Sequence, residues 1–175
     1  MGTGQMMLTL AAMMLLGTVI LTVNTGLMQT TTTMNNSRVD IMAISLGNSI
    51  MEDATSLSFD ESTVSGAITS TSPLTAIASL GTDGTESRNN PAGFDDFDDY
   101  NCYRTIAKVD VVPVPGTNRS FTFNTYCSVD YIDQNNPDNI SGSKTFHKRI
   151  KLRVFTPGMS DTIRLSTVYS YWYFR

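Results

Sequence analysis

Charge is scarce in this chain, and so are the residues on which most active sites depend. Only 16% of the 175 residues are charged, one residue is histidine, two are cysteine, and the formal net charge is -4. No phosphate-cradling glycine loop and no zinc-ligand spacing occurs, and no second base accompanies the histidine to activate a serine or threonine nucleophile. An acidic chain also offers no cationic surface to nucleic acid. We therefore expect neither an enzyme nor a nucleic-acid-binding protein.

Charged side chains are absent altogether from residues 5–28, which are apolar apart from scattered Thr, Gly, Gln and Asn. About 20 residues of α-helix cross a hydrocarbon core of about 30 Å, so this segment is long enough to span a bilayer. A secretory signal peptide has a basic first region and a shorter apolar core, whereas only Met-Gly-Thr-Gly precedes this segment. We favour a membrane-length helix over a signal peptide.

Proline is absent before Pro73, so the helix is not interrupted where the apolar segment ends. Apolar residues keep helical spacing through residues 27–57, which predicts one helix over residues 1–57 with an amphipathic part at 29–57. Four consecutive threonines occupy 30–33. Because threonine is a poor helix former, a kink or a locally melted turn is expected there.

Alternating apolar and polar residues predict four strands in the second half of the chain, separated by turn residues such as those around Pro113 and Pro157. Sequential strands with short connections most simply form an antiparallel meander, one face of which must be covered. The amphipathic part of the helix is available to cover it. We therefore predict an α+β fold, with a helix at 1–57 and a β-rich head at 58–175 that includes a connection at 58–100.

The third predicted strand carries a basic row. One face of that strand is expected to hold Phe146, Lys148, Ile150, Leu152 and Val154. The other face is expected to hold His147, Arg149, Lys151 and Arg153.

Both cysteines, Cys102 and Cys127, fall in the head. In an oxidising compartment they would most simply form a disulfide that closes a loop of about 25 residues, a stabilisation of roughly 3 kcal/mol in the chain-entropy model. Two free buried thiols are the alternative.

An apolar half-helix of this length cannot remain in water, so it must enter a membrane or pack against copies of itself. The small residues Gly4, Ala11, Ala12, Gly17 and Gly26 would let neighbouring helices approach closely in either setting. The residues expected to make these assembly contacts are the large apolar ones, namely Met6, Met7, Leu8, Leu10, Met13, Met14, Leu15, Leu16, Val19, Ile20, Leu21, Val23 and Leu27.

Taken together, an apolar helix that continues as an amphipathic one, a variable connection and a cysteine-bearing antiparallel sheet resemble the type IV pilin superfamily. Residues 94–100, Phe-Asp-Asp-Phe-Asp-Asp-Tyr, are similar to the Phe-Asp-Asp-x-Asp-Asp-Tyr signature of pilin-like proteins of the mannose-sensitive haemagglutinin pilus type. Residues 148–154, Lys-Arg-Ile-Lys-Leu-Arg-Val, fall where those proteins carry a similar strand.

The resemblance implies a subunit that is held in the inner membrane until the pilus assembly machinery extracts it into an extracellular helical filament of identical copies. A processing junction would lie between Gly4 and Gln5, which places Thr9 where the family carries a glutamate. The alternatives are a minor pilin or pseudopilin that primes or caps a filament, and a single-pass membrane protein that displays a small binding domain.

The acidic motif has three interpretations. Its carboxylates could bind Ca²⁺, they could belong to a solvated or aromatic-pinned structural turn, or they could contact a basic strand face of the next subunit. The acidic candidates are Asp95, Asp96, Asp98 and Asp99, and the basic ones are Arg149, Lys151 and Arg153. Apart from this calcium candidate, we expect no cofactor.

Overall fold

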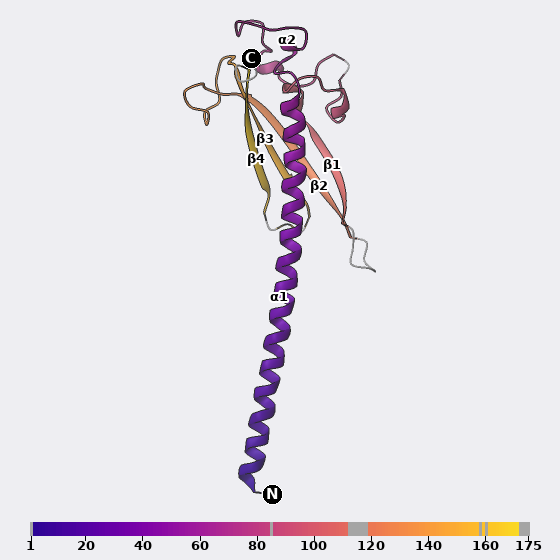
Figure 1. Ribbon diagram of the computed structural model, residues 1–175, viewed down its shortest axis with the longest axis vertical. Helices are drawn as coiled ribbons and strands as arrows, with labels where there is room; N and C mark the ends of the chain where they lie inside the picture. The colour runs from indigo at the N-terminus through magenta and orange to yellow at the C-terminus, as the bar shows by residue number, and fades with distance from the viewer. Residues whose placement is uncertain (1, 85, 112–118, 158, 160, 172–175) are drawn as a thin grey trace. The chain divides into compact units, whose positions relative to one another are not determined.

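The computed structural model describes residues 2–84, 86–111, 119–157, 159 and 161–171. The chain divides into two compact units, Met1–Val39 and Asp40–Arg175. One helix, α1 (Thr3–Ser56), supplies residues to both units and ends within one residue of the predicted end (Figure 1). We refer to the second unit as the head.

In the first unit, the described chain is helical from Thr3 onward, and every described side chain up to residue 38 is exposed. The helix continues through the four threonines at 30–33, so no melted turn occurs there. Each threonine hydroxyl donates a hydrogen bond of 2.9–3.0 Å to the carbonyl four residues earlier. This back-bonding satisfies the hydroxyls without breaking the helical backbone.

The described part of the head contains a four-stranded sheet in the order β1-β2-β3-β4, with every neighbouring pair antiparallel. The strands are β1 (Arg104–Val111), β2 (Arg119–Tyr131), β3 (His147–Phe155) and β4 (Ile163–Ser170). The predicted α+β fold with an antiparallel meander is therefore confirmed.

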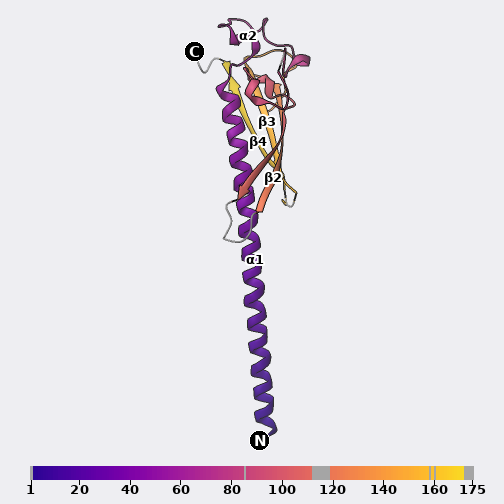
Figure 2. The ribbon, with the colours of Figure 1, turned by 90° about the vertical axis from the view of Figure 1, so that its right-hand side faces the viewer.

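The part of α1 that belongs to the head packs on one face of the sheet (Figure 2). A stripe of small or aliphatic residues makes this contact, with Ala43, Gly47, Ile50 and Ala54 all buried at helical spacing. A Cβ atom at Gly47 would lie 2.5 Å from Leu165 Cδ1, so the missing side chain is what allows the helix to approach this closely.

The predicted alternation along β3 is confirmed, because Lys148, Ile150, Leu152 and Val154 are all buried. Lys148 therefore lies in the core row rather than at the surface. Arg149, on the opposite row, is also mostly buried, since its guanidinium turns away from water to donate to two backbone carbonyls.

The described part of the connection between α1 and β1 contains four short helical turns. They are α2 (Glu61–Val64), η1 (Ile77–Ser79), η2 (Pro91–Gly93) and η3 (Asp98–Tyr100). Asp60 caps α2, and its side chain and that of Thr63 form a reciprocal capping box. The cap fixes Asp60, and η3 fixes the second half of the acidic motif.

Candidate functional site

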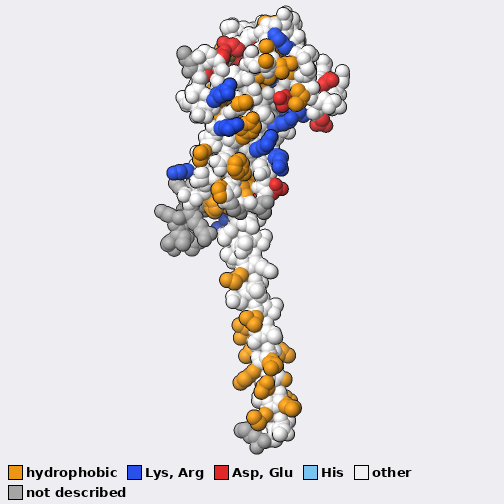
Figure 3. Space-filling view, turned by 180° about the vertical axis from the view of Figure 1, so that it is seen from behind, with side chains coloured by type: hydrophobic (Ala, Val, Ile, Leu, Met, Phe, Trp, Pro, Cys, Tyr) orange, Lys and Arg blue, Asp and Glu red, His pale blue; other side chains and the backbone are white. Residues whose placement is uncertain are grey.

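The thirteen large apolar residues expected to make assembly contacts all lie in the first unit and are all exposed, from 49% at Val19 to 76% at Met7. They surround the helix rather than forming one stripe, and Figure 3 shows apolar side chains along this part of the chain. Within the described residues, α1 is the one helix that is long and apolar enough to cross a membrane. The segment therefore has a large apolar surface with no partner inside its own unit.

The small residues of this segment leave open space beside the helix. A Cβ atom placed at Gly4, Gly17 or Gly26 would meet nothing within 4 Å. The predicted processing junction, Gly4–Gln5, lies in the first turn of α1, where the Gln5 N–H donates to the Gly2 carbonyl at 2.9 Å.

The acidic motif forms a compact turn that is held by its own side chains. Asp96 Oδ1 accepts hydrogen bonds from the backbone N–H groups of Asp98 and Asp99 at 2.7 and 3.2 Å. Asp99 Oδ2 accepts from the N–H groups of Asp95 and Asp96 at 3.1 and 3.2 Å. These bonds use the carboxylates as backbone acceptors, the usual role of Asp in tight turns.

Aromatic rings complete this turn. Phe94 makes edge contacts with Tyr100 and Tyr103, with ring centroids 5.0 and 5.6 Å apart. Tyr100 and Tyr103 contact each other at 5.5 Å. The structural-turn interpretation of the motif is the one that this geometry supports.

Three of the four acids that were predicted to contact the next subunit are buried in the head, and the contact itself stays a prediction. Asp96, Asp98 and Asp99 are only 2–3% exposed, so their carboxylates do not reach the surface of the folded head. Asp95 is exposed. Burial follows from the turn itself, which points these side chains at backbone N–H groups and at a core lysine.

The basic candidates also have partners within the chain. Arg149 donates to the carbonyls of Pro137 and Asp138 at 2.8 and 3.2 Å. Lys151 lies 3.6 Å from an Asp130 carboxylate oxygen in a partly exposed pair. Arg153 is exposed and lies over the ring of Tyr126, 5.7 Å from its centroid.

Calcium binding stays a prediction, but the carboxylates that lie close together differ from the four aspartates expected from the sequence. Two groups of carboxylates lie close enough to share a cation, Glu61–Asp95–Asp96 and Glu86–Asp95–Asp99. Asp98 belongs to neither group. Partial burial and the neighbouring Asp99 and Asp95 raise the pKa of Glu86 to about 7, which shows how closely these carboxyls approach one another.

The most unusual feature of the head is the ammonium group of Lys148, which is buried in the core. The side chain of Lys148 is fully buried, and its Nζ donates to Asp60 Oδ2 at 2.7 Å, to the Phe59 carbonyl at 2.9 Å and to Asp98 Oδ1. Nζ also lies over the rings of Phe59 and Tyr131, 4.6 and 5.2 Å from their centroids. A buried charge is tolerated only when it is paired and hydrogen-bonded, and this one is both.

Hydrogen-bond donors surround Asp60. Its carboxylate accepts from the N–H groups of Ser62 and Thr75 at 3.2 and 3.0 Å and from the Tyr131 hydroxyl at 3.1 Å. Burial favours its neutral form, but Lys148 and these donors outweigh burial and hold the pKa of Asp60 below its ordinary value. Asp60 is therefore the stable anion of the cluster.

Asp96 and Asp98 behave in the opposite way. Burial raises the pKa of Asp98 even though Lys148 is adjacent. Burial, with Asp98 and Asp99 nearby, raises the pKa of Asp96 to about 9, so Asp96 keeps its proton at neutral pH. The Asp96 and Asp98 carboxyls are hydrogen-bonded to each other. The cluster thus contains an anion, an ammonium and a neutral acid side by side.

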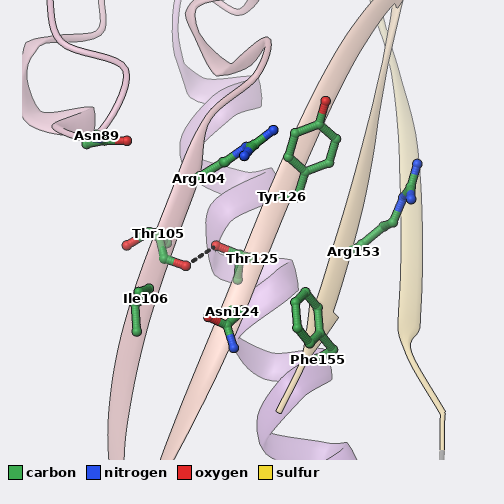
Figure 4. A pocket seen from close by; sticks show the side chains of 9 residues that line it. All are labelled: Asn89, Arg104, Thr105, Ile106, Asn124, Thr125, Tyr126, Arg153 and Phe155. Carbon is green, nitrogen blue, oxygen red and sulfur yellow. Dashed lines mark hydrogen bonds between the residues drawn. The ribbon is translucent and has the colours of Figure 1, made fainter. Parts of the chain in front are cut away.

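An open groove of about 870 Å³ lies over β1, β2 and β3 on the side of the sheet away from α1 (Figure 4). Register places Arg104, Tyr126 and Arg153 opposite one another on adjacent strands. The two guanidinium groups flank the tyrosine ring at 5.0 and 5.7 Å from its centroid. The residues that line the groove are Asn89, Arg104, Thr105, Ile106, Asn124, Thr125, Tyr126, Arg153 and Phe155.

Cys102 and Cys127 are free thiols in this structure, Cys127 buried and Cys102 half-buried, and the disulfide between them stays a prediction. Their backbones are neighbours, since the Cys102 N–H donates to the Cys127 carbonyl at 3.2 Å. Cys127 belongs to the buried row of β2, whereas Cys102 lies in a turn with φ of 65°. Burial raises the pKa of the Cys127 thiol to about 12, which keeps it protonated and unreactive.

Sequence reasoning missed Asp60 and the role of Lys148. A signal for Lys148 was present, because a lysine in the apolar row of a predicted strand requires a buried counter-charge. No local signal marks Asp60, which is 88 residues away in a Ser- and Thr-rich connection.

Compared with protein-family models, with curated proteins and with solved structures, the chain shows no significant match to any of them.

Proposed function

We propose that this protein is a structural subunit of an extracellular filament of the type IV pilus kind, which polymerises by bundling the apolar segment of α1. The observation that carries the proposal is that all thirteen large apolar residues of residues 6–27 are exposed in the single chain, with no charged residue among them. A surface of this kind marks an interaction site rather than a soluble face.

Burial of this surface supplies ample free energy for assembly. Each fully buried Val, Leu, Ile or Met side chain contributes about 1.5–3 kcal/mol. Association costs an estimated 4–15 kcal/mol in lost freedom of motion. Burial of all thirteen side chains from water contributes about 20–39 kcal/mol and exceeds this cost, and the open space beside Gly17 and Gly26 supports close helix approach.

In this proposal the same segment spans the inner membrane before assembly, and the subunit is then a single-pass membrane protein. Its partners are identical subunits and the pilus assembly machinery. The length of α1 supports continuation beyond a membrane, because 54 residues at about 1.5 Å each exceed a hydrocarbon core of about 30 Å. The head supplies the polar surface of the filament.

The test is electron microscopy of material sheared from the surface of cells that make the protein, combined with mass spectrometry of that material. We expect filaments in which this chain is the most abundant protein. Trace amounts in filaments made of another protein would assign it the minor-pilin role. Recovery of the chain only from the membrane fraction, as a monomer in detergent, would overturn the proposal in favour of a membrane-anchored binding domain.

A further inference from the structure

Lys148 forms ion pairs with Asp60 and Asp98, and it is also positioned to react with Asp98. We propose that Lys148 and Asp98 condense inside the folded head to form an intramolecular amide bond, with Asp60 and Asp96 as the proton-transfer groups. The bond would join β3 to η3 across 50 residues of sequence. Neither a metal ion nor a cofactor is needed, since the reaction only releases water.

The contact between Lys148 and Asp98 and the exclusion of bulk water from their surroundings both favour the reaction. Lys148 Nζ already contacts Asp98 Oδ1, and both side chains are buried, with 0% and 2% exposed. Holding two reacting groups in contact is equivalent to an effective concentration of roughly 10⁵–10⁸ M. Exclusion of bulk water also removes the reactant that would hydrolyse the product.

Asp98, rather than Asp60, is the electrophile. Asp60 is held as a carboxylate by Ser62, Thr75 and Tyr131, and an anion with several donors resists attack at carbon. Asp98 has a hydrogen bond from the neutral carboxyl of Asp96, which draws electron density away from its carbon. Asp96 can therefore act as general acid, and Asp60, 2.7 Å from Nζ, can act as general base.

The steps balance without an oxidant or reductant. Lys148 passes one ammonium proton to Asp60, and Asp96 passes its proton to the carboxylate of Asp98. The neutral amine of Lys148 then attacks Cγ of Asp98 to form the C–N bond. The nitrogen returns a proton to Asp96, Asp60 protonates the departing hydroxyl, and the C–O bond breaks to release water. Asp60 and Asp96 finish in their starting states.

The experiment is intact-mass and peptide mass spectrometry of the full chain, purified in detergent. We expect a mass one water below that calculated from the sequence. Trypsin cannot cleave after an acylated lysine, so the digest should contain residues 89–104 joined to residues 145–149. A succinimide at Asp83-Gly84 would also lose one water, but it would give no joined peptide.

Two variants sharpen the test. Lys148→Arg keeps the positive charge but lacks the nucleophilic amine, so it should restore the full mass and abolish the joined peptide. Lys151→Arg is the matched control. Lys151 lies on β3, as Lys148 does, but it pairs with Asp130 of β2 in a partly exposed position. This variant should leave the joined peptide unchanged. The proposal is overturned if the folded wild-type chain has the full calculated mass and yields residue 148 only in unjoined peptides. That measurement needs no variant to fold.

Discussion

The two units of the molecule differ in which side chains they bury. Met1–Val39 exposes large apolar side chains and has no charged residue before Arg38, whereas the head buries Lys148 with Asp60 and Asp98. The first unit exposes apolar surface. The second pairs its buried ammonium group from within the chain. In the proposed filament, assembly therefore depends on the first unit.

The largest expected effect comes from placing a charge in the apolar segment. Val19→Lys should abolish filaments, because a lysine at the centre of an apolar helix costs about 2.5–3.5 kcal/mol on insertion scales and is repeated in every copy. The matched control Val19→Leu keeps the site apolar and should assemble as the wild type does. The measurement is the yield of sheared surface filaments relative to total protein by immunoblot. An equal yield from Val19→Lys would contradict the view that this segment is a buried core.

The next largest effect tests the head alone. Lys148→Met leaves the carboxyl groups of Asp60 and Asp98 buried without their partner at residue 148 and should lower the free energy of unfolding by about 3–5 kcal/mol. Lys151→Met, at the partly exposed pair with Asp130, should cost less than about 1 kcal/mol. Denaturant unfolding of the detergent-solubilised chain, followed by near-ultraviolet circular dichroism, compares the two. Equal losses would mean that the buried cluster does not stabilise the head.

A smaller effect follows from the proton held by Asp96. Its pKa is about 9 in the folded head and near 3.8 in the unfolded chain, so between these values the folded state binds more protons. Stability contributed by this group must therefore fall as the pH rises from about 4 to about 9. Asp96→Asn keeps a neutral side chain with a donor and an acceptor, and its stability relative to the wild type should increase as the pH rises from 5 to 8.

The thermal unfolding midpoint across this pH range checks the prediction. The contribution of Asp60 to stability depends on pH in the opposite direction, because its pKa lies below the ordinary value. This contribution is lost only as the pH falls below about 4. The comparison of the wild type with Asp96→Asn isolates Asp96, because the other carboxyl groups with raised pKa values, such as Glu86, are present in both proteins. A pH slope that is the same in the wild type and in Asp96→Asn would show that Asp96 is not the titrating group.

The smallest effect compares one glycine from each unit. Gly47→Ala would bring a methyl group within 2.5 Å of Leu165 Cδ1, so overpacking of about 1–3 kcal/mol opposes a gain of about 1 kcal/mol in helix propensity. Gly26→Ala meets no atom within 4 Å and should only gain helix propensity. The unfolding midpoint in detergent should therefore rise less for Gly47→Ala than for Gly26→Ala, or fall. An equal rise for both would show that the Cβ atom of residue 47 meets no resistance from Leu165.

Features with local periodicity could be predicted from sequence. The extent of α1 and the alternating rows of β3 follow from spacing between neighbouring residues, which the backbone fixes directly. The threonines at 30–33 are helical although threonine is a poor helix former, because propensity is a small preference that helical context outweighs.

The Lys148 cluster could not be predicted, because it depends on contacts between residues 50 and 88 apart in the chain. Asp98 looked like a solvated or metal-binding acid because nothing near it in sequence identifies a lysine partner. The state of the two cysteines also lies beyond sequence prediction, because the distance between them depends on the sheet and on the turn at Cys102.

Fibre formation by the intact chain and by a chain that starts at Gln29 tests the central claim most directly. Both are transferred from detergent into buffer and imaged by negative-stain electron microscopy, with circular dichroism to confirm that each head is folded. We predict ordered fibres from the intact chain and dispersed, folded monomers from the shorter one. Ordered fibres from the chain without residues 1–28 would contradict the account.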